Sequence, residues 1–312
     1  MTRKKGTPPS NVAHSVKARL LQRARRDGED FNSLLVRYVL ERLLYRLGVS
    51  PHANEFVLKG ALLFVVWSNQ AHRATKDLDL LGSGPPEPAR LAQIFAEISE
   101  IAAPDDGVIF VVESIVAEPI REEAVYDGIR LRFAARLGNA EIPVQVDVGF
   151  GDTTVPEPQE TELPALLDFP APSLRAYARE SSIAEKCHAM VELGLANTRM
   201  KDFYDLWFLA TEYSFEGTVL AEAIQATFVR RRTVVPSDEP VALSNEFATD
   251  PAKLNQWTAF LRRARLRKQA PPLVQLIAVL RTFLMPVLRA ATGTGAFDLR
   301  WQRGGPWETR AS

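Results

Sequence analysis

The sequence of 312 residues contains a single cysteine, Cys187, and only four histidines. One cysteine excludes an internal disulfide and a zinc site built from several cysteines, and it is typical of a protein in a reducing compartment. Net charge is missing as well, because 38 Lys and Arg residues balance 38 Asp and Glu residues. A neutral chain has no overall attraction for nucleic acid or membranes, so any basic binding surface has to be local.

Long hydrophobic runs are also scarce. The apolar stretch "ALLFVVW" (61–67) is much shorter than a membrane span, and no apolar segment follows the basic start "MTRKKGTPPS". We therefore expect no signal peptide, no membrane partner and a cytoplasmic location. With 46% hydrophobic and 24% charged residues, the composition is that of a globular protein large enough for one or two domains.

Hydrophobic periodicity divides the chain into three regions. Residues 12–47 have helical spacing and end at Gly48. The middle of the chain combines a helix at 88–102 with β-rich runs at 75–82, 106–120, 127–138 and 140–152. After the linker-like "VPEPQETELP" (155–164), five helices are predicted at 181–194, 200–213, 217–231, 251–268 and 272–290, followed by a Gly-rich tail. We therefore predict an α+β protein with a helical N-terminal segment (1–50), an α+β core (51–160) and a helical C-terminal domain with a flexible tail (161–312).

The stretch "HRATKDLDLLG" (72–82) places Asp77 and Asp79 two residues apart in a short strand. Residues at this spacing point to the same face of a strand, so two like charges would lie side by side. A third carboxylate, Asp147, alternates with core valines in "IPVQVDVGFGD" (142–152). If the two strands are neighbours, the three carboxylates converge and form the hard oxygen ligands that Mg²⁺ prefers. The alternative is an ordinary acidic pair, neutralised by Arg73 and Lys76.

Two further segments contain residues suited to phosphate binding. In "EFVLKGALLFVVW" (55–67), Lys59 and Gly60 stand where a buried helix is expected to begin, and a glycine there lets backbone N–H groups approach a phosphate. A simple tight turn would explain the glycine equally well. In "SSIAEKCHAMVELG" (181–194), Lys186 lies off the apolar stripe of a helix and could contact a triphosphate, or could merely be solvated.

The helix "MKDFYDLWFLA" (200–210) carries Asp202 and Asp205 on one face. Asp205 could pair with Lys201, and Asp202 would interact favourably with the helix dipole near the N-terminus.

Seven segments in this order and spacing resemble the AbiEii-type nucleotidyltransferase family, which are toxins of type IV toxin–antitoxin and abortive-infection systems. They are "ERLLYRL", "FVLKGALLF", "RATKDLDLLG", "YDGIRLRF", "VQVDVGFGD", "IAEKCHAMVELG" and "RMKDFYDLWFL". The resemblance runs from about residue 30 to about residue 212. The resemblance implies a DNA-polymerase-β-like nucleotidyltransferase core with a helical C-terminal half. It also implies a nucleoside triphosphate donor, Mg²⁺ and, as in some relatives, transfer to the 3′ end of tRNA that blocks translation.

The resemblance assigns roles to the residues singled out above. Asp77 and Asp79 hold the metal together with Asp147, which could help to activate the acceptor hydroxyl. Lys186 binds the triphosphate, and Asp202 or Asp205 orients it or a basic neighbour. One difference from the fold's usual pattern is the pair Gly60–Ala61, since a serine that would contact the phosphates is replaced by alanine.

The acceptor is expected to bind a basic ridge. A helix through "FLRRARLRK" (260–268) would carry a cluster suited to an RNA backbone, although a solvated helix face is an equally good explanation. The cluster consists of Arg262, Arg263, Arg265, Arg267 and Lys268.

We therefore predict a Mg²⁺-dependent nucleotidyltransferase toxin with an NTP donor, a tRNA or other RNA acceptor, and a role in phage defence. A cognate antitoxin with a winged-helix domain is the expected protein partner. The alternatives are transfer to a small molecule or to a protein side chain, and a non-catalytic nucleotide-binding regulator.

Overall fold

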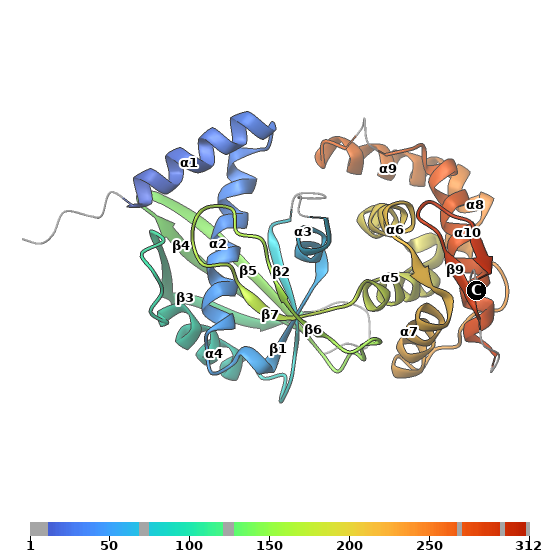
Figure 1. The fold of residues 1–312 in the computed structure, drawn as a ribbon, viewed down its shortest axis with the longest axis horizontal. Coiled ribbons are helices and arrows are strands. Elements are labelled where there is room, and N and C mark those ends of the chain that lie inside the picture. Colours follow the sequence, from blue (N-terminus) through green and yellow to red (C-terminus); the bar gives the residue numbers. More distant parts are fainter. Residues whose placement is uncertain (1–11, 69–74, 121–127, 267–269, 294–296, 310–312) are drawn as a thin grey trace, which may run out of the picture. The chain divides into compact units, whose positions relative to one another are not determined.

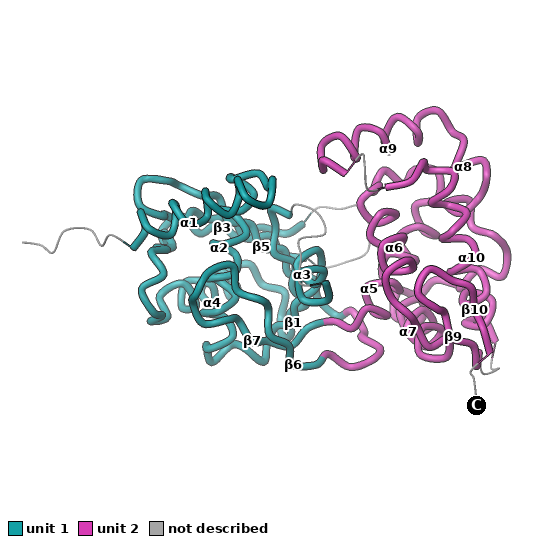
Figure 2. The backbone as a smooth tube through the Cα atoms, turned by 45° about the horizontal axis from the view of Figure 1, so that its top comes forward, with its two compact units in different colours: residues 1–151, 159–176 teal, residues 152–158, 177–312 magenta. Residues whose placement is uncertain are grey.

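The computed structural model of the protein describes residues 12–68, 75–120, 128–266, 270–293 and 297–309. The chain forms two compact units (Figure 2). Unit 1 comprises residues 1–151 and 159–176, and unit 2 comprises residues 152–158 and 177–312. This division differs from the expected one, because the N-terminal helices and residues 159–176 belong to the same unit as the β-rich core.

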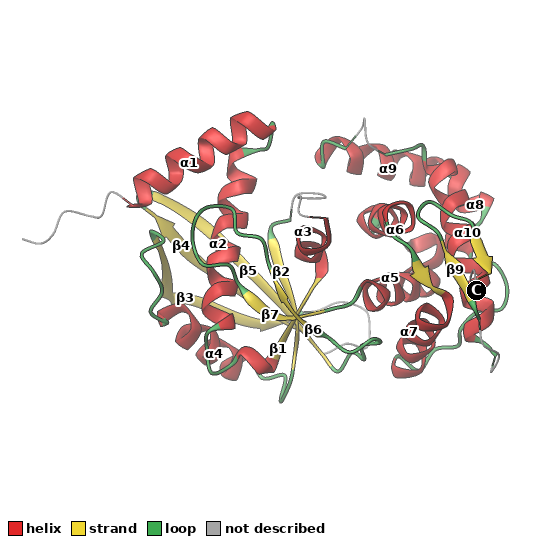
Figure 3. Ribbon diagram, in the orientation of Figure 1, coloured by secondary structure: helices red, strands yellow, loops and turns green. Residues whose placement is uncertain are grey.

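Unit 1 is built around a seven-stranded mixed sheet (Figures 1 and 3). Its strand order is β3-β4-β5-β2-β1-β7-β6, in which β2 and β5 are parallel neighbours and β1 pairs antiparallel with β2. The strands are β1 (Phe56–Lys59), β2 (Asp77–Gly82), β3 (Val108–Pro119), β4 (Gly128–Leu137), β5 (Ala140–Phe150), β6 (Gln159–Glu162) and β7 (Ser173–Ala176). The α+β class and the strands expected around Asp77 and Asp147 are therefore confirmed.

Four helices accompany this sheet: α1 (Val12–Asp27), α2 (Phe31–Gly48), α3 (Leu63–Ser68) and α4 (Pro88–Glu100). The helical segment predicted at 12–47 is in fact two helices. Gly28 has a positive φ of 68°, which a residue without a side chain adopts readily, and the Asp30 side chain then caps α2 by accepting a hydrogen bond from Ser33 N at 2.9 Å.

Helix α2 is anchored to unit 1 by charged side chains as well as by leucines. Arg46 forms two hydrogen bonds with Asp106, at 2.8 and 3.2 Å, and both residues are buried. Glu41 contacts Arg42 at 2.7 Å and also accepts a hydrogen bond from the backbone N–H of Leu166 at 2.7 Å. Each of these buried charges has a partner, as burial in a core requires. The N-terminal helices are therefore an integral part of the unit.

The strands that carry the candidate site have one buried face. Leu78 and Leu80 of β2 and Val146 and Val148 of β5 are completely buried, whereas Asp77, Asp79 and Asp147 are partly exposed on the other face. This alternation is the period of two that the sequence shows. It places all three carboxylates on the same side of the sheet.

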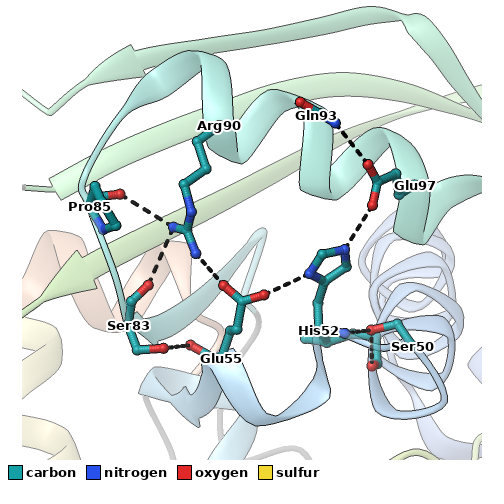
Figure 4. Close-up of polar contacts among 9 residues, drawn as sticks. Ser50, His52, Glu55, Ser83, Pro85, Arg90, Gln93 and Glu97 are labelled. Carbon is teal, nitrogen blue, oxygen red and sulfur yellow. Dashed lines mark hydrogen bonds and ion pairs between the residues drawn. The ribbon is translucent and has the colours of Figure 1, made fainter.

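A polar network ties the β1–β2 end of the sheet to α4 (Figure 4). His52 contacts Glu55 through Nδ1 at 2.7 Å and Glu97 through Nε2 at 2.8 Å. Arg90 donates to the other Glu55 oxygen and to the backbone carbonyl of Ser83. Burial opposes the charged form of His52, but the two carboxylates outweigh it, so the pKa of His52 is raised.

This network predicts a pH dependence of stability. Folding raises the pKa of His52 above the unfolded value of about 6.5. The contribution of charged His52 to the free energy of unfolding is therefore complete below about pH 6.5. The stabilisation is lost as the pH rises through the folded pKa. We expect His52→Gln to lower the melting temperature by about 2–4 °C at pH 6 and by less at pH 8. An equal loss at the two pH values would show that His52 is not charged in the folded protein.

Unit 2 is mainly helical, with a three-stranded sheet of order β10-β9-β8. Its elements are α5 (Arg179–Leu193), α6 (Met200–Glu212), β8 (Phe215–Glu216), α7 (Gly217–Arg230), α8 (Asn245–Thr249), α9 (Pro251–Arg263), α10 (Leu273–Ala291), β9 (Leu299–Trp301) and β10 (Trp307–Thr309). Each predicted helix has a counterpart, although α9 ends before the predicted residue 268, and α8 is an additional short helix.

The C-terminal segment differs from the flexible tail that the sequence indicated. Trp301 is 1% exposed and donates a hydrogen bond from Nε1 to the carbonyl of Ala210 at 2.7 Å. Trp307 stacks on Phe283, with a centroid separation of 5.9 Å and an interplanar angle of 8°. Two tryptophans therefore hold residues 299–309 against the helices of unit 2, despite the many glycines.

Among the described residues, α10 alone is long and apolar enough to cross a membrane, judged by length and composition. Half of its most apolar window is buried, and it packs against α6, α7 and α8 within unit 2. Its hydrophobicity is thus accounted for by its position in the core of the unit.

Candidate active site

Three carboxylates meet on the exposed face of β2 and β5. The parallel register places Asp79 directly opposite Asp147 and Asp77 opposite Gln145. One oxygen from each of Asp77, Asp79 and Asp147 lies within 4.8 Å of the others. The convergence predicted from the sequence is therefore present, and it requires the parallel pairing of two strands whose paired residues, such as Asp79 and Asp147, are 68 positions apart in the chain.

Asp147 has a positively charged partner that the sequence analysis missed. Arg130 on β4 donates from Nε and Nη2 to the two oxygens of Asp147, at 2.8 and 2.6 Å. A signal was available: β4 and β5 form a hairpin whose two turn residues, Gly138 and Asn139, follow Leu137 and precede Ala140. Counting back along both strands from that turn places Arg130 opposite Asp147.

Other side chains also contact the carboxylates. Thr75 donates from Oγ1 to Oδ1 of Asp77 at 2.6 Å, and Gln145 donates weakly to Asp147 at 3.3 Å. Arg73, one of the two cations considered in the sequence analysis, lies outside the described residues. Repulsion among the carboxylates is therefore reduced by Arg130 and by hydroxyl and amide donors from neighbouring positions.

Gly60 approaches the carboxylate of Asp79 more closely than any residue with a side chain could. Its φ is +75°, and a Cβ atom built there would lie 1.9 Å from Oδ2 of Asp79. Lys59 pairs with Asp79 in the β1–β2 register. Lys59 and Gly60, two of the three residues expected to bind nucleotide, are thus adjacent to the carboxylates. The predicted buried helix begins here as a 3₁₀ turn at 60–62, which continues into the six residues of α3.

A second polar cluster lies within unit 2. Lys186 on α5 places its Nζ atom 2.8 Å from Oδ1 of Asp202 and 3.0 Å from Oδ2 of Asp205. The Nε atom of Arg199 is 2.8 Å from the other oxygen of Asp202, Oδ2. The two aspartates are 1% and 0% exposed. Burial works to raise the pKa of Asp202, but the charges of Lys186 and Arg199 outweigh it and lower the pKa.

This geometry answers the question of which late aspartate contacts the lysine, because both do. Asp205 pairs with Lys186, whereas Lys201, the alternative partner, is exposed. It also changes the interpretation of Lys186, whose ammonium group lies between two buried carboxylates. Its removal would leave two buried charges poorly compensated, so this lysine contributes to stability.

The basic ridge expected on a helix at 251–268 is not formed as predicted. Helix α9 ends at Arg263, and Arg265 has a left-handed φ of 58°. The backbone N–H of Leu266 then bonds to the carbonyl of Leu261 at 2.9 Å, and both leucines are buried. This is a Schellman termination whose closing hydrogen bond joins two buried leucines, formed here without the usual glycine.

The termination divides the five residues of the predicted ridge. Arg262 and Arg263 lie exposed in the last turn of α9, and Arg265 follows the end of the helix. Arg267 and Lys268 lie outside the described residues. A continuous helical ridge of five cations is therefore excluded, because the helix ends before the third of them.

An open mixed sheet with three converging carboxylates, together with a helical unit that holds a buried lysine–aspartate cluster, indicates the class of α+β nucleotidyltransferases. The chain belongs to the AbiEii family: the family model described as nucleotidyl transferase AbiEii toxin, type IV TA system, matches residues 42–278. This match includes every residue of the two polar clusters and both strands of the carboxylate site.

Two solved structures are similar to this chain over most of its length. JHP933 from Helicobacter pylori shares 16% sequence identity with a TM-score of 0.47, covering 83% of this chain and 91% of its own. A second H. pylori protein, named as a candidate nucleotidyltransferase, shares 16% identity with a TM-score of 0.46, covering 83% and 94%. A search of curated proteins finds no match.

Membership of this family makes the chain a nucleotidyltransferase of the toxin type. It implies a nucleotide substrate and an antitoxin partner, since the family is defined by toxin–antitoxin systems.

Proposed function

We propose that the protein is a Mg²⁺-dependent toxin that transfers a nucleotide from an NTP to an acceptor hydroxyl at the 3′ end of tRNA, thereby blocking translation. The observation that carries the proposal is the convergence of Asp77, Asp79 and Asp147 within 4.8 Å on one face of the sheet. The hydroxyl oxygen would attack the α-phosphorus, and the bond to the departing pyrophosphate would break.

The residues present fit a magnesium site. Three carboxylates offer the hard oxygen ligands that Mg²⁺ takes, and their part-exposed face leaves space for substrate phosphates. Asp77 and Asp79 would hold the ion, which when bound would neutralise negative charge on the phosphates. Arg130 donates one hydrogen bond to each oxygen of Asp147, which leaves a lone pair on both oxygens for the ion. We therefore assign Asp147 to the metal site, from which it would also accept the proton of the acceptor hydroxyl.

Lys59, Gly60 and Lys186 are the proposed contacts of the donor. Gly60 lets the Asp79 carboxylate lie directly against the backbone. The backbone N–H groups of this turn are the proposed phosphate donors in place of the missing serine hydroxyl. Lys186 would present a positive charge to the triphosphate, with Asp202 and Asp205 fixing the position of its ammonium group.

The biological part of the proposal follows from the family. A nucleotide donor and an RNA acceptor would place the reaction in the cytoplasm. The cognate antitoxin is proposed to carry a winged-helix domain, and the system to act in phage defence.

Incubation of the protein with each labelled NTP, Mg²⁺ and total cellular RNA tests this function, with Asp79→Asn protein and a chelator as controls. We expect a labelled product of tRNA size that is absent from both controls. A labelled protein band or a labelled small molecule would replace the RNA acceptor by one of the alternatives. Binding of NTP without any labelled product would favour the non-catalytic regulator.

A further inference from the structure

A cavity of about 400 Å³ lies within unit 2 between the start of α6 and one face of α9. Four of its lining residues, Gln256, Ala259, Phe260 and Arg263, recur at the i, i+3, i+4 and i+7 spacing of a single helix face. The other side is formed by residues 198–201. A volume of this size falls within the usual range of small-ligand sites.

Three cations line the cavity in a chain without net charge. The described residues that line it include Arg199, Lys201 and Arg263 but no acidic side chain. Arg199 is held in place by the buried carboxylate of Asp202, at 2.8 Å. Lys201 and Arg263 are exposed. A concave site bordered by one ion-paired and two exposed cations attracts an anion.

The cavity also contains an aromatic surface held in a fixed position. Phe260 is half-buried, and its ring lies 5.5 Å from that of Trp257 and 5.9 Å from that of Tyr204, centroid to centroid. The neighbouring Ala259 has only a methyl side chain. Cations next to an aromatic ring are the combination by which proteins bind single-stranded nucleic acids, one holding the phosphate and the other stacking on the base.

We propose that this cavity binds one nucleotide of the single-stranded end of the RNA acceptor, with Lys201 and Arg263 on the phosphate and Phe260 against the base. The inference deepens the proposed function, on which it rests for the identity of the acceptor. It replaces the predicted five-residue ridge by a site that requires only one of that ridge's residues, Arg263. Arg262, its neighbour in the same turn, does not line the cavity.

That difference between neighbours provides a matched control. Binding of a labelled single-stranded RNA of about ten nucleotides is measured without NTP or metal, across a salt series, so that the result does not depend on catalysis. The Lys201→Gln, Arg263→Gln double variant is expected to weaken binding about tenfold or more. Each lost phosphate contact should flatten the log–log salt dependence by about 0.7. Arg262→Gln should leave both quantities near those of the wild type.

Phe260→Leu tests the stacking part of the proposal, with an expected loss of about fivefold or more in affinity and an unchanged salt slope. Because Phe260 packs on two aromatic rings, the melting temperature of the Phe260→Leu variant is measured together with its RNA affinity. The substitutions of Lys201 and Arg263 do not alter that packing. Equal effects of Arg262→Gln and Arg263→Gln, or identical salt slopes for the wild type and the double variant, would overturn the site. Weakened ATP binding with normal RNA binding would assign the cavity to the donor instead.

The RNA-labelling experiment distinguishes this inference from the function on which it rests. Transfer to RNA by the wild type, together with unaltered RNA binding by the cavity variants, would refute the cavity and retain the function. Cavity-dependent RNA binding without transfer would refute the function and retain the binding site.

Discussion

Asp77→Asn and Asp79→Asn are each expected to lower nucleotidyl transfer by at least about a hundredfold while leaving the fold intact. An amide has nearly the size of a carboxylate, so the packing beside Gly60 is preserved. The negative charge of the carboxylate is lost, however, and with it the strongest attraction for a divalent cation. Losing one of several like charges on this face could also raise the melting temperature of the metal-free protein.

The measurement has two parts, because loss of activity alone does not identify the metal. Transfer is followed by labelled product, and metal binding by the rise in melting temperature that Mg²⁺ or Mn²⁺ produces. The wild type is expected to show both, and the two variants neither. Glu141→Gln is the matched control, since Glu141 lies exposed on the same strand β5 and outside the carboxylate site. A variant that keeps its metal-dependent shift and its activity would remove that aspartate from the site.

Lys186→Met is expected to destabilise the protein by about 3–5 kcal/mol, the loss typical of breaking a buried ion pair from one side. The reason is geometric: Nζ lies within 3.0 Å of oxygens of Asp202 and Asp205, which are almost completely buried. The sequence pattern, which places Lys186 off the apolar stripe, predicts the opposite, namely little change in stability.

A double-mutant cycle distinguishes the two interpretations of Lys186. If Lys186 compensates Asp205, adding Asp205→Asn to Lys186→Met should cost much less than the sum of the two single losses in urea unfolding. Lys186→Arg retains the charge and should retain part of the stability. Normal stability of Lys186→Met with a raised donor KM would instead show that the lysine acts on the nucleotide alone.

The site in unit 1 could be predicted from the sequence to a large extent. Alternation of period two around Asp77, Asp79 and Asp147 is a local property, because side chains on successive strand residues point to opposite faces. The faces of the helices that carry Lys186, Asp202 and Asp205 follow in the same way from their spacing. Local patterns therefore identified every residue of the two polar clusters except the arginines and the uncharged donors Thr75 and Gln145.

What the sequence pattern left open was which segments become neighbours. The pairing of β2 with β5 and the insertion of Lys186 between two buried aspartates depend on how separate elements pack, whereas the position of Arg130 opposite Asp147 follows from the β4–β5 hairpin and was open to counting from its turn. The end of α9 before Arg265 depends on the burial of Leu261 and Leu266, which overrides the helical propensity of the arginines. By itself the sequence determined which faces carry charge, because that is fixed by backbone geometry over a few residues. Only the tertiary structure decided which charges meet, because that depends on how the whole chain buries its apolar surface.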